Sequence, residues 1–375
     1  MSQFPYRTVF ATTMMWNRPI ILSLAAVVIA LAPCVAQGQS RRQLRMGDRP
    51  AQVTGEELTP EARRAIDKGL EWLASRQNPD GSFGGSSSYG AQSAVTALSG
   101  LAFMSAGHLP GRGKYGDHVQ KAVDYICNNA QESGLLASEA SHGVMYSHGF
   151  ATLFLGEVYG MTGDERVKET LQKAVRLIHR AQNEEGGWRY TPVPYDADIS
   201  VTICEVMGLR AARDAGIKVE KETIDRAIAY VRRCQNPDGG FSYVANFGGG
   251  GGSAFERSAA GVATLYYAGV FEGDELKRGL DYIARFRPRE GGGRSLSHYY
   301  YGHYYAAQAM FLAGGDYWAE WYPAIRDELI NTRQNPETGA FSGEVSPEYA
   351  TACALIILQM PNRYLPVFNG KGPGG

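Results

Sequence analysis

A turn that reads Gln-Asn-Pro-Asp-Gly-Ser-Phe at residues 77–83 recurs in related forms along the chain, and each copy joins an amphipathic helix to a more apolar one. The six turns begin at Gln77, Gln131, Gln182, Gln235, Arg287 and Gln334, so successive turns are 54, 51, 53, 52 and 47 residues apart by subtraction. A repeat of this length is typical of stacked helical hairpins, because each hairpin buries its apolar face only against its neighbours. We therefore expect an all-α fold of six hairpins.

The two helices of each hairpin differ in their hydrophobic pattern. The first helices carry apolar residues at helical spacing, as with Ile66, Leu70 and Leu73, and charges elsewhere, so one face is buried. The second helices, such as residues 93–106, 258–270 and 349–360, are apolar or small nearly all round, which indicates protein on both sides. We expect the second helices to form an inner ring whose N-termini gather at one end, where any pocket should open.

The repeat also resembles a known family. The pattern Lys68-Gly69-x-x-Trp72-Leu73-x-x-x-Gln77-x-x-x-Gly81-x-Phe83 closely resembles the Gln-Trp repeat of squalene and hopene cyclases and of protein prenyltransferase β subunits. Residues 180–188, Arg-Ala-Gln-Asn-Glu-Glu-Gly-Gly-Trp, form a second copy. The resemblance covers about residues 58–360 and implies an α/α six-hairpin toroid of the terpenoid cyclase and prenyltransferase superfamily. Because one fold carries many chemistries, it does not fix the reaction.

The ends of the chain differ from its middle. Residues 1–36 have the features of an export signal, with two arginines before a short apolar run and Cys34-Val35-Ala36 as a small-residue cleavage site. The run is too short to span a bilayer. Proline before Cys34 argues against lipoprotein anchoring. We expect a flexible segment over residues 37–59, one toroid domain over 60–365, a flexible tail over 366–375, and a secreted or periplasmic protein without a transmembrane segment.

The charge of the chain limits the classes of partner that it can bind, and its cysteines indicate how its thiols are used. The formal charge is −1, and removal of residues 1–36 takes away two positive and no negative residues, which gives −3. This balance argues against nucleic acid and leaves a small-molecule, lipid-like or protein partner. Four cysteines remain, and their positions favour free buried thiols, although an exported protein could oxidise them: Cys127, Cys204, Cys234 and Cys353.

Polar and aromatic residues gather where the second helices are expected to begin, and tyrosine suits carbohydrates, isoprenoids or aromatic groups. The candidate ligand-binding residues are Tyr89, His142, His148, Glu256, Arg257, His298, Tyr300, Tyr301, His303, Tyr304 and Tyr349. We expect no metal, because the histidine pairs lack the i, i+4 spacing that brings two imidazoles together on a helix. We expect no cofactor either, since no Gly-Lys-Ser/Thr follows the glycines at 248–252.

The run Asp196-Ala197-Asp198-Ile199-Ser200-Val201 resembles the Asp-x-Asp-Asp-Thr-Ala run with which hopene-type cyclases protonate an alkene. The resemblance implies Asp198 as the acid and Asp196 as its partner, with one carboxyl missing at Ile199. Asp198 also precedes an apolar helix in a capping arrangement, which would stabilise its anion. Both interpretations stay open.

We expect an exported toroid with a central pocket for an isoprenoid-like or peptide ligand and without the full catalytic set. The chain has no Asp-x-Cys for zinc-dependent prenyl transfer, and it has residues for one toroid, whereas the triterpene cyclases enclose substrate between two helical domains. The alternatives are an isoprenoid cyclase that uses Asp198 as acid, a polysaccharide lyase or hydrolase that uses His303, Tyr304 and Arg257, and a non-catalytic interaction scaffold. An axis filled by tyrosine rings would count against the enzymes.

Overall fold

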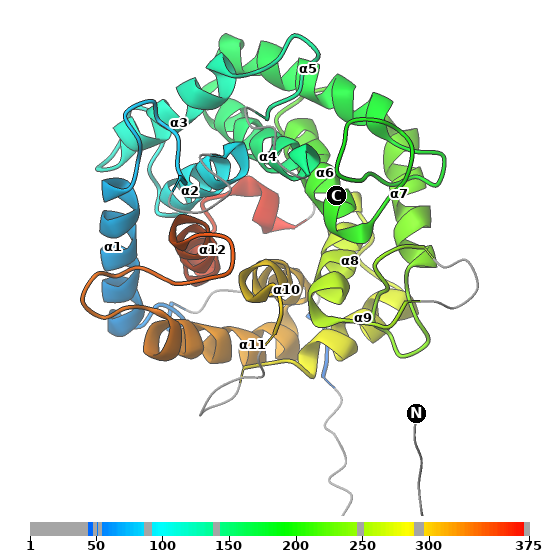
Figure 1. Ribbon diagram of the computed structural model, residues 1–375. Coiled ribbons are helices and arrows are strands. Elements are labelled where there is room, and N and C mark those ends of the chain that lie inside the picture. Colours follow the sequence, from blue (N-terminus) through cyan, green and yellow to red (C-terminus); the bar gives the residue numbers. More distant parts are fainter. Residues whose placement is uncertain are drawn as a thin grey trace, which may run out of the picture. The chain divides into compact units, whose positions relative to one another are not determined.

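Twelve α-helices alternate between an outer and an inner layer in the computed structural model (Figure 1), which describes residues 44–47, 51, 55–85, 92–137, 143–245, 251–288 and 296–370. The outer helices are α1 (Pro60–Ser75), α3 (Gly116–Asn128), α5 (Glu165–Ala181), α7 (Lys221–Arg233), α9 (Asp274–Ala284) and α11 (Gly315–Glu328). The inner helices are α2 (Ser93–Ser105), α4 (Val144–Thr162), α6 (Ile199–Asp214), α8 (Phe255–Ala268), α10 (Tyr299–Ala313) and α12 (Pro347–Gln359).

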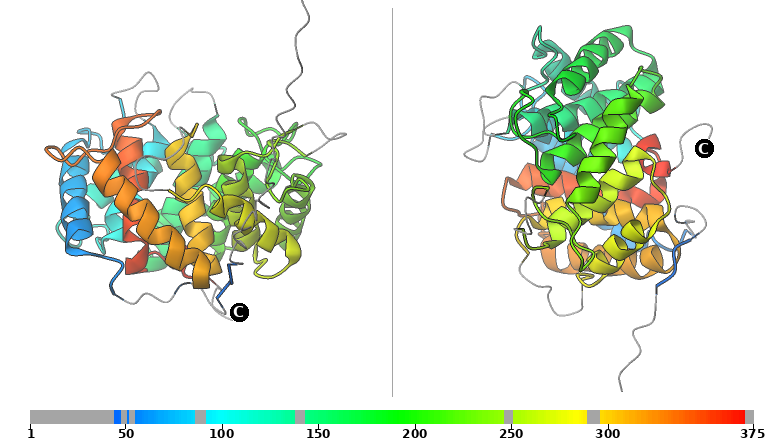
Figure 2. Two further views of the ribbon diagram at one scale, coloured as in Figure 1. Left: turned by 90° about the horizontal axis from the view of Figure 1, so that it is seen from below. Right: turned by 90° about the vertical axis from the view of Figure 1, so that its right-hand side faces the viewer.

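The inner helices of the unit Leu44–Gly375 form a closed cycle. Contacts run from α2 to α4, α6, α8, α10 and α12, and α12 returns to α2. Outer helices lie against this cycle, for example α3 on α2, α5 on α4, α9 on α8 and α1 on α12. Figure 2 shows the ring from two further sides. The described residues contain only isolated β-bridges and no strand. The predicted all-α six-hairpin toroid is therefore confirmed.

The inner helices α4 and α6 are parallel. Three glycines of α4 each face a residue of α6 or its C-cap that lies 55 positions later by subtraction: Gly149 faces Cys204, Gly156 faces Ala211 and Gly160 faces Ala215. A Cβ atom added at Gly149 would lie 2.6 Å from the Cβ atom of Cys204, so the small side chains let the two helices approach closely. Because the paired numbers rise together, α4 and α6 begin at the same end of the ring.

At four of the six turns, the first glutamine joins its hairpin to the next outer helix, whereas Nε2 of Gln131 donates to the carbonyl of Ala137 in its own hairpin. Nε2 of Gln182 donates to the carbonyl of Gly186 at 2.8 Å within its own turn, and to the carbonyl of Thr223 at 2.9 Å in α7. The same double contact links Gln77 to Gly81 and His118, Gln235 to Gly239 and Glu275, and Gln334 to Gly339 and Ala65. The last of these joins the sixth hairpin to the first and closes the ring.

The turn glycine completes this joint. Gly186 has φ +100°, and a Cβ atom there would lie 2.3 Å from the carbonyl oxygen of Arg226 in α7. Gly81, Gly134, Gly239 and Gly339 also have positive φ, and a Cβ atom at any of them would lie 2.3 to 2.6 Å from a carbonyl oxygen of the next outer helix. Glycine alone both adopts this backbone conformation at little cost and leaves room for the adjacent helix.

The fifth turn contacts the next outer helix in a different way. Arg287 replaces the glutamine and pairs with Glu320 in the first half of α11, where α7 and α9 carry Arg226 and Arg278. An ion pair between side chains thus stands where four of the other turns use a glutamine side chain and a backbone carbonyl. The charge reversal at Glu320 explains why an arginine is accommodated at this turn.

Parts of both segments that we expected to be flexible pack against the ring. The Ala51 N–H donates to the carbonyl of Phe311 at 2.8 Å, and Ala51 is buried. After α12, the chain forms short 3₁₀ helices η2 (Met360–Asn362) and η3 (Pro366–Asn369), and Val367 and Phe368 are buried. The apolar ends of the inner helices must be shielded from water. Composition alone did not show that these two segments would pack against them. Residues 1–36, the predicted export signal, lie outside the described residues.

Three further findings concern the described residues. No helix among the described residues is long and apolar enough to cross a membrane. The four cysteines in the described part of the chain are free, and Cys204, Cys234 and Cys353 are buried, as expected of thiols that act as small hydrophobes. The π-helix η1 (Leu329–Arg333) extends α11 to the sixth turn.

We expect Gly186→Ala to destabilise the fold by at least about 1 kcal/mol more than Gly216→Ala. Both glycines have positive φ, so both alanines carry the strain of the left-handed region, on the order of 1–2 kcal/mol. Only at Gly186 does the added Cβ atom collide with a neighbouring backbone, whereas nothing lies within 4 Å of it at Gly216. Urea denaturation of the two variants measures the difference, and equal losses would show that the turn joint does not depend on this close contact.

Candidate functional site

The inner helices begin at one end of the ring, which we call the mouth. At the start of α6, Oδ1 of Asp198 accepts hydrogen bonds from the backbone N–H groups of Ser200 at 2.8 Å and Val201 at 2.9 Å. The Asp198 N–H in turn donates to the carbonyl of Trp188 at 2.9 Å, and Trp188 is the buried aromatic residue of the third turn. The predicted helix cap is thus confirmed, and the repeat itself positions Asp198.

An arginine brings the two predicted catalytic aspartates together. Nη1 of Arg189 donates to Oδ2 of Asp196 at 2.6 Å, and Nε of Arg189 lies 3.6 Å from Oδ2 of Asp198. The guanidinium also lies 5.2 Å and 5.7 Å from the ring centres of Tyr190 and Tyr243, which is cation–π geometry. The sequence analysis missed Arg189, although its place directly after the turn aromatic Trp188 marks it as a mouth residue.

Burial sets the acidity of Asp198. Its side chain is fully buried, and burial raises its pKa from 3.8 to about 6. The backbone N–H groups of Val201 and Ser200, the Tyr243 hydroxyl and Arg189 oppose that rise, because each favours the anion. At neutral pH Asp198 is therefore mainly ionised and held by its cap and by Arg189.

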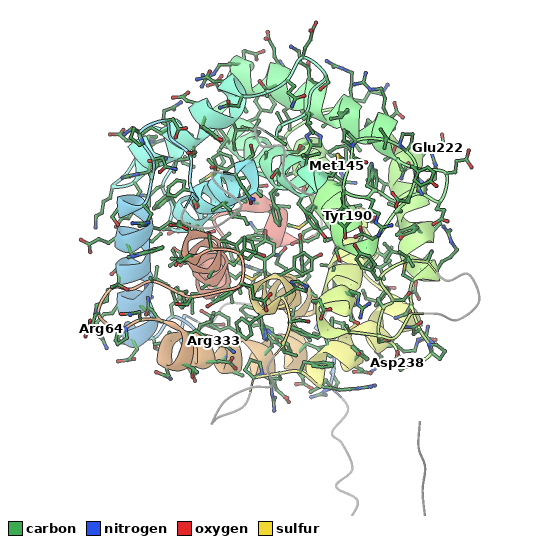
Figure 3. All side chains as sticks on the ribbon, in the orientation of Figure 1. Arg64, Met145, Tyr190, Glu222, Asp238 and Arg333 are labelled. Carbon is green, nitrogen blue, oxygen red and sulfur yellow. The ribbon has the colours of Figure 1, made fainter. Side chains whose placement is uncertain are left out.

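Aromatic rings from three further segments surround this group. The Tyr146 ring of α4 lies 6.1 Å from the Tyr190 ring, and the hydroxyls of Tyr190 and Tyr243 contact each other. The Tyr301 hydroxyl of α10 donates to the carbonyl of Ser200 at 3.0 Å. Tyr190 lies close to Met145, at the side of the ring where α4 and α6 begin (Figure 3), and its carbonyl accepts from the Met145 N–H at 3.2 Å.

Tyrosines of α10 reach across the ring axis. The Tyr305 hydroxyl lies 3.3 Å from Sγ of Cys204 on α6, and the Tyr304 ring lies 6.1 Å from the Phe150 ring on α4. Neither α4 nor α6 is a neighbour of α10 in the cycle, so these contacts cross its centre. Tyr304 and Tyr305 are almost fully buried. The axis at this level is filled by phenol rings, so Tyr304 does not belong to an open rim.

Two of the three described candidate histidines, His148 and His303, are packed inside the protein. Nδ1 of His148 lies 3.2 Å from the Leu136 N–H, and its Nε2 lies 3.3 Å from the carbonyl of Ala174. Burial lowers the pKa of His148 to about 4, so the ring is neutral. At four other turns the equivalent backbone N–H group donates to a hydroxyl, that of Thr96, Thr202, Ser258 or Thr351. His148 therefore replaces a threonine or serine as the hydrogen-bond acceptor of its turn.

His303 packs against the rings of Phe255, Tyr299 and Trp321, with centroid distances of 4.9, 4.4 and 5.7 Å. Burial lowers its pKa to about 3, with Arg333 adding to the effect. His303 and Tyr304 are each 1% exposed, so a polysaccharide lyase trio with Arg257 has no shared exposed face.

The other candidates are spread over several helix starts. Glu256 and Arg257 lie within the first turn of α8 and not before it, and Nε of Arg257 is 3.7 Å from Oε1 of Glu256. His298 is exposed at the start of α10, with Nδ1 3.3 Å from Glu344. Tyr300 is buried and Tyr349 is half-buried, while Tyr89 and His142 lie outside the described residues. The described residues hold no group of three or more His, Cys, Asp or Glu that could bind a metal.

Residues 57–295 match the family model of the prenyltransferase alpha-alpha toroid domain. The chain belongs to this family. A curated relative in sequence is a drimenyl diphosphate synthase from Streptomyces showdoensis, 28% identical over 183 residues, which are 48% of this chain and 32% of the synthase. The chain thus spans about a third of the length of that relative.

Solved structures share the toroid at low sequence identity. An α-1,6-mannanase from Salegentibacter sp. is 10% identical with a TM-score of 0.60, and the match covers 81% of this chain and 99% of the mannanase. Cellobiose 2-epimerase from Spirochaeta thermophila is 15% identical with a TM-score of 0.59, over 81% and 98% of the two chains. The type II terpene cyclase MstE from Scytonema is 14% identical with a TM-score of 0.55, over 82% and 100%. At these identities the likeness concerns the fold.

We expect the stability of the wild-type protein, relative to an Asp198→Asn variant, to fall by about 2–3 kcal/mol between pH 4 and pH 7. The folded pKa of Asp198 is raised, so its protonated form favours folding below about pH 4, and this contribution is lost as the pH rises through 6. Asparagine keeps a capping oxygen and does not titrate. Urea denaturation of both proteins across this pH range measures the difference, and a constant difference would contradict the raised pKa.

Proposed function

We propose that this exported toroid binds an isoprenoid-like or peptide ligand at its mouth, on the surface around the start of α6. Four of the five exposed large hydrophobic side chains among the described residues gather there: Tyr190 at 38%, Val193 at 53%, Tyr195 at 86% and Val244 at 40% exposure. We call these four residues the mouth patch. Exposed apolar side chains gathered in one place are typical of an interaction site, and this concentration carries the proposal.

The loop that presents the mouth patch is held in shape. The Val193 N–H donates to the carbonyl of Thr191 at 2.8 Å, and the Tyr195 N–H donates to the carbonyl of Val193 at 2.9 Å. Pro192 and Pro194 restrict the backbone between these tight turns. A loop that is already ordered loses little entropy when a ligand binds, so its exposed apolar side chains favour binding.

Arg189 and Asp196 give the mouth patch a polar border. Their side chains are 31% and 42% exposed, and they hold each other by the 2.6 Å hydrogen bond. An apolar ligand with a hydroxyl or charged headgroup would meet one donor and one acceptor here, which would set its orientation. Ionised Asp198 behind Arg189 acts in this proposal as a cap and not as an acid.

Binding is tested by isothermal titration with polyprenyl alcohols, hopanoids and apolar peptides. We expect a double Val193→Ser, Tyr195→Ser variant to bind its ligand at least about tenfold more weakly, because it removes roughly 100 Å² or more of apolar contact at about 25 cal/mol per Å². Tyr364→Ser is the matched control, since Tyr364 is 54% exposed and lies outside the patch. Absence of binding across the panel, or equal binding by both variants, would contradict the proposal.

A second candidate is an isoprenoid cyclase in which Asp198 protonates the substrate. Oδ2 of Asp198 is buried without a hydrogen-bond donor in good geometry among the described residues, so it is the atom that would carry a proton. Another MstE structure is a complex with geranylgeranyl dihydroxybenzoate, its substrate, and all of that terpene cyclase chain is covered by this toroid. This similarity removes the objection that a chain of this size is too short for a cyclase. It supports the chemistry only by analogy.

If this second function holds, we expect conversion of geranylgeranyl compounds by the wild type and a loss of at least about a hundredfold in Asp198→Asn, because general acid catalysis contributes on that scale. Mass spectrometry of extracted products measures the conversion. Asp225→Asn is the control, since Asp225 is an exposed carboxylate of α7 outside the mouth. No product from the wild type, or equal rates in Asp198→Asn, would rule out Asp198 as the acid.

A further inference from the structure

The end of the ring opposite the mouth is crossed by a segment of the chain. After α12 the chain passes through η2 and η3, and η3 contacts α6 and α10. In the closed cycle α6 is the member opposite α12, so the segment runs from one side of the ring to the other (Figure 1). We call residues 365–370 the strap.

Apolar side chains anchor the strap. Leu365, Val367 and Phe368 are 1%, 1% and 3% exposed. Before the strap, Tyr364 is 54% exposed and Arg363 has φ +57°, which is uncommon for a residue with a side chain. The buried part is therefore short, begins after an exposed and sharply turned connection, and consists chiefly of a Val-Phe pair.

Fixed polar groups of the inner helices meet the strap backbone. Nη2 of Arg210 on α6 donates to the carbonyl of Gly370 at 2.5 Å, while Nε of Arg210 donates to Oδ2 of Asp214 at 2.5 Å. Arg210 is 4% exposed, so a buried arginine is held in place by Asp214 and offers a second N–H group to a peptide carbonyl.

Glu157 of α4 supplies a second polar group at this end and is 3% exposed. Burial raises its pKa to about 8. A hydrogen bond with the Val367 backbone lowers that pKa, the charge of Asp214 raises it, and the charge of Arg210 lowers it. The carboxyl is thus mainly neutral at pH 7 beside the strap backbone. Nearby, the Tyr267 hydroxyl of α8 donates to Oε1 of Gln308 of α10 at 2.6 Å, so those two side chains satisfy each other.

We infer that this end of the ring is a peptide-binding site, which the chain fills with its own strap. The site accepts an apolar peptide whose Val-Phe side chains enter between α6 and α10, and whose backbone carbonyl binds Arg210. The recognition groups belong to inner helices that the ring holds in place, and the strap supplies only side chains and backbone that any peptide of the same chemistry could supply. This site is separate from the mouth patch and does not depend on the function proposed for it.

Exchange of the strap tests the site. A specific protease sequence inserted after Tyr364 lets the intact chain fold and then frees residues 365–375. The probe is a fluorescent peptide of residues 365–370 with an amidated end, so that Gly370 keeps its carbonyl. By fluorescence anisotropy we expect saturable binding to the cleaved protein and none to the uncleaved protein, whose site is occupied. A probe with Phe368→Asp should not bind, whereas one with Asn369→Ala, which loses only the exposed 3.2 Å hydrogen bond to the Arg363 carbonyl, should bind less than about fivefold more weakly.

The role of Arg210 is tested with a matched pair of variants. Arg210→Met should weaken probe binding by about 10- to 100-fold, because it removes a hydrogen bond from a charged donor. Arg213→Met should change binding less than about threefold, because Arg213 approaches the same Asp214, with Nε 3.6 Å from Oδ1, and is 43% exposed. A folded cleaved protein that takes up no probe, or one that binds the Phe368→Asp probe equally, would overturn the inference.

If cleavage unfolds the ring, hydrogen exchange of the uncleaved chain still tests the inference. Arg210→Met should speed hydrogen exchange at the Val367 and Phe368 amides by at least about tenfold relative to Arg213→Met. Equal exchange in the two variants would show that Arg210 does not hold the strap, and would overturn the inference as well.

Discussion

The contact between each turn and the next outer helix is the constraint on which the ring depends. A turn glutamine donates to two backbone carbonyls, one in its own turn and one in the neighbouring hairpin, and the turn glycine lets the two backbones meet at that point. An isolated hairpin would leave these carbonyls and its apolar face exposed. The geometry of one joint therefore sets the angle between hairpins, and its repetition brings the inner helices round into a closed cycle with all their N-termini at the mouth.

Much of the fold could be predicted because four of the six repeats build the same joint from the same residues. Gln77, Gln182 and Gln235 all occupy equivalent places, so the number of hairpins and the order of layers follow from their spacing. The start of α8 was predicted too late, because Glu256 and Arg257 look like loop residues in sequence and lie in a helix whose first turn is partly exposed. Similarly, Phe368 is buried by a contact with helices distant in sequence, which no local pattern announces.

The site was only partly predictable for the same reason. Asp196 and Asp198 lie together as their spacing suggested, and the cap on α6 follows from local sequence. The partners Arg189 and Tyr243 come from two different turns, so their meeting depends on how neighbouring hairpins pack. His148 was misplaced because a histidine can substitute for a buried threonine as a hydrogen-bond acceptor, and composition gives both residues a polar character. The sequence therefore did not predict the directions in which side chains point from the inner helices.

The contact of Gln334 with Ala65 has a consequence for the order of hairpins along the chain. It joins residues 269 positions apart with the same geometry that elsewhere joins residues about 40 positions apart. The first and last hairpins are thus neighbours of an ordinary kind, and no hairpin is structurally the beginning. A circular permutant, opened at another turn and linked across the old ends, would preserve every joint except the one that is cut.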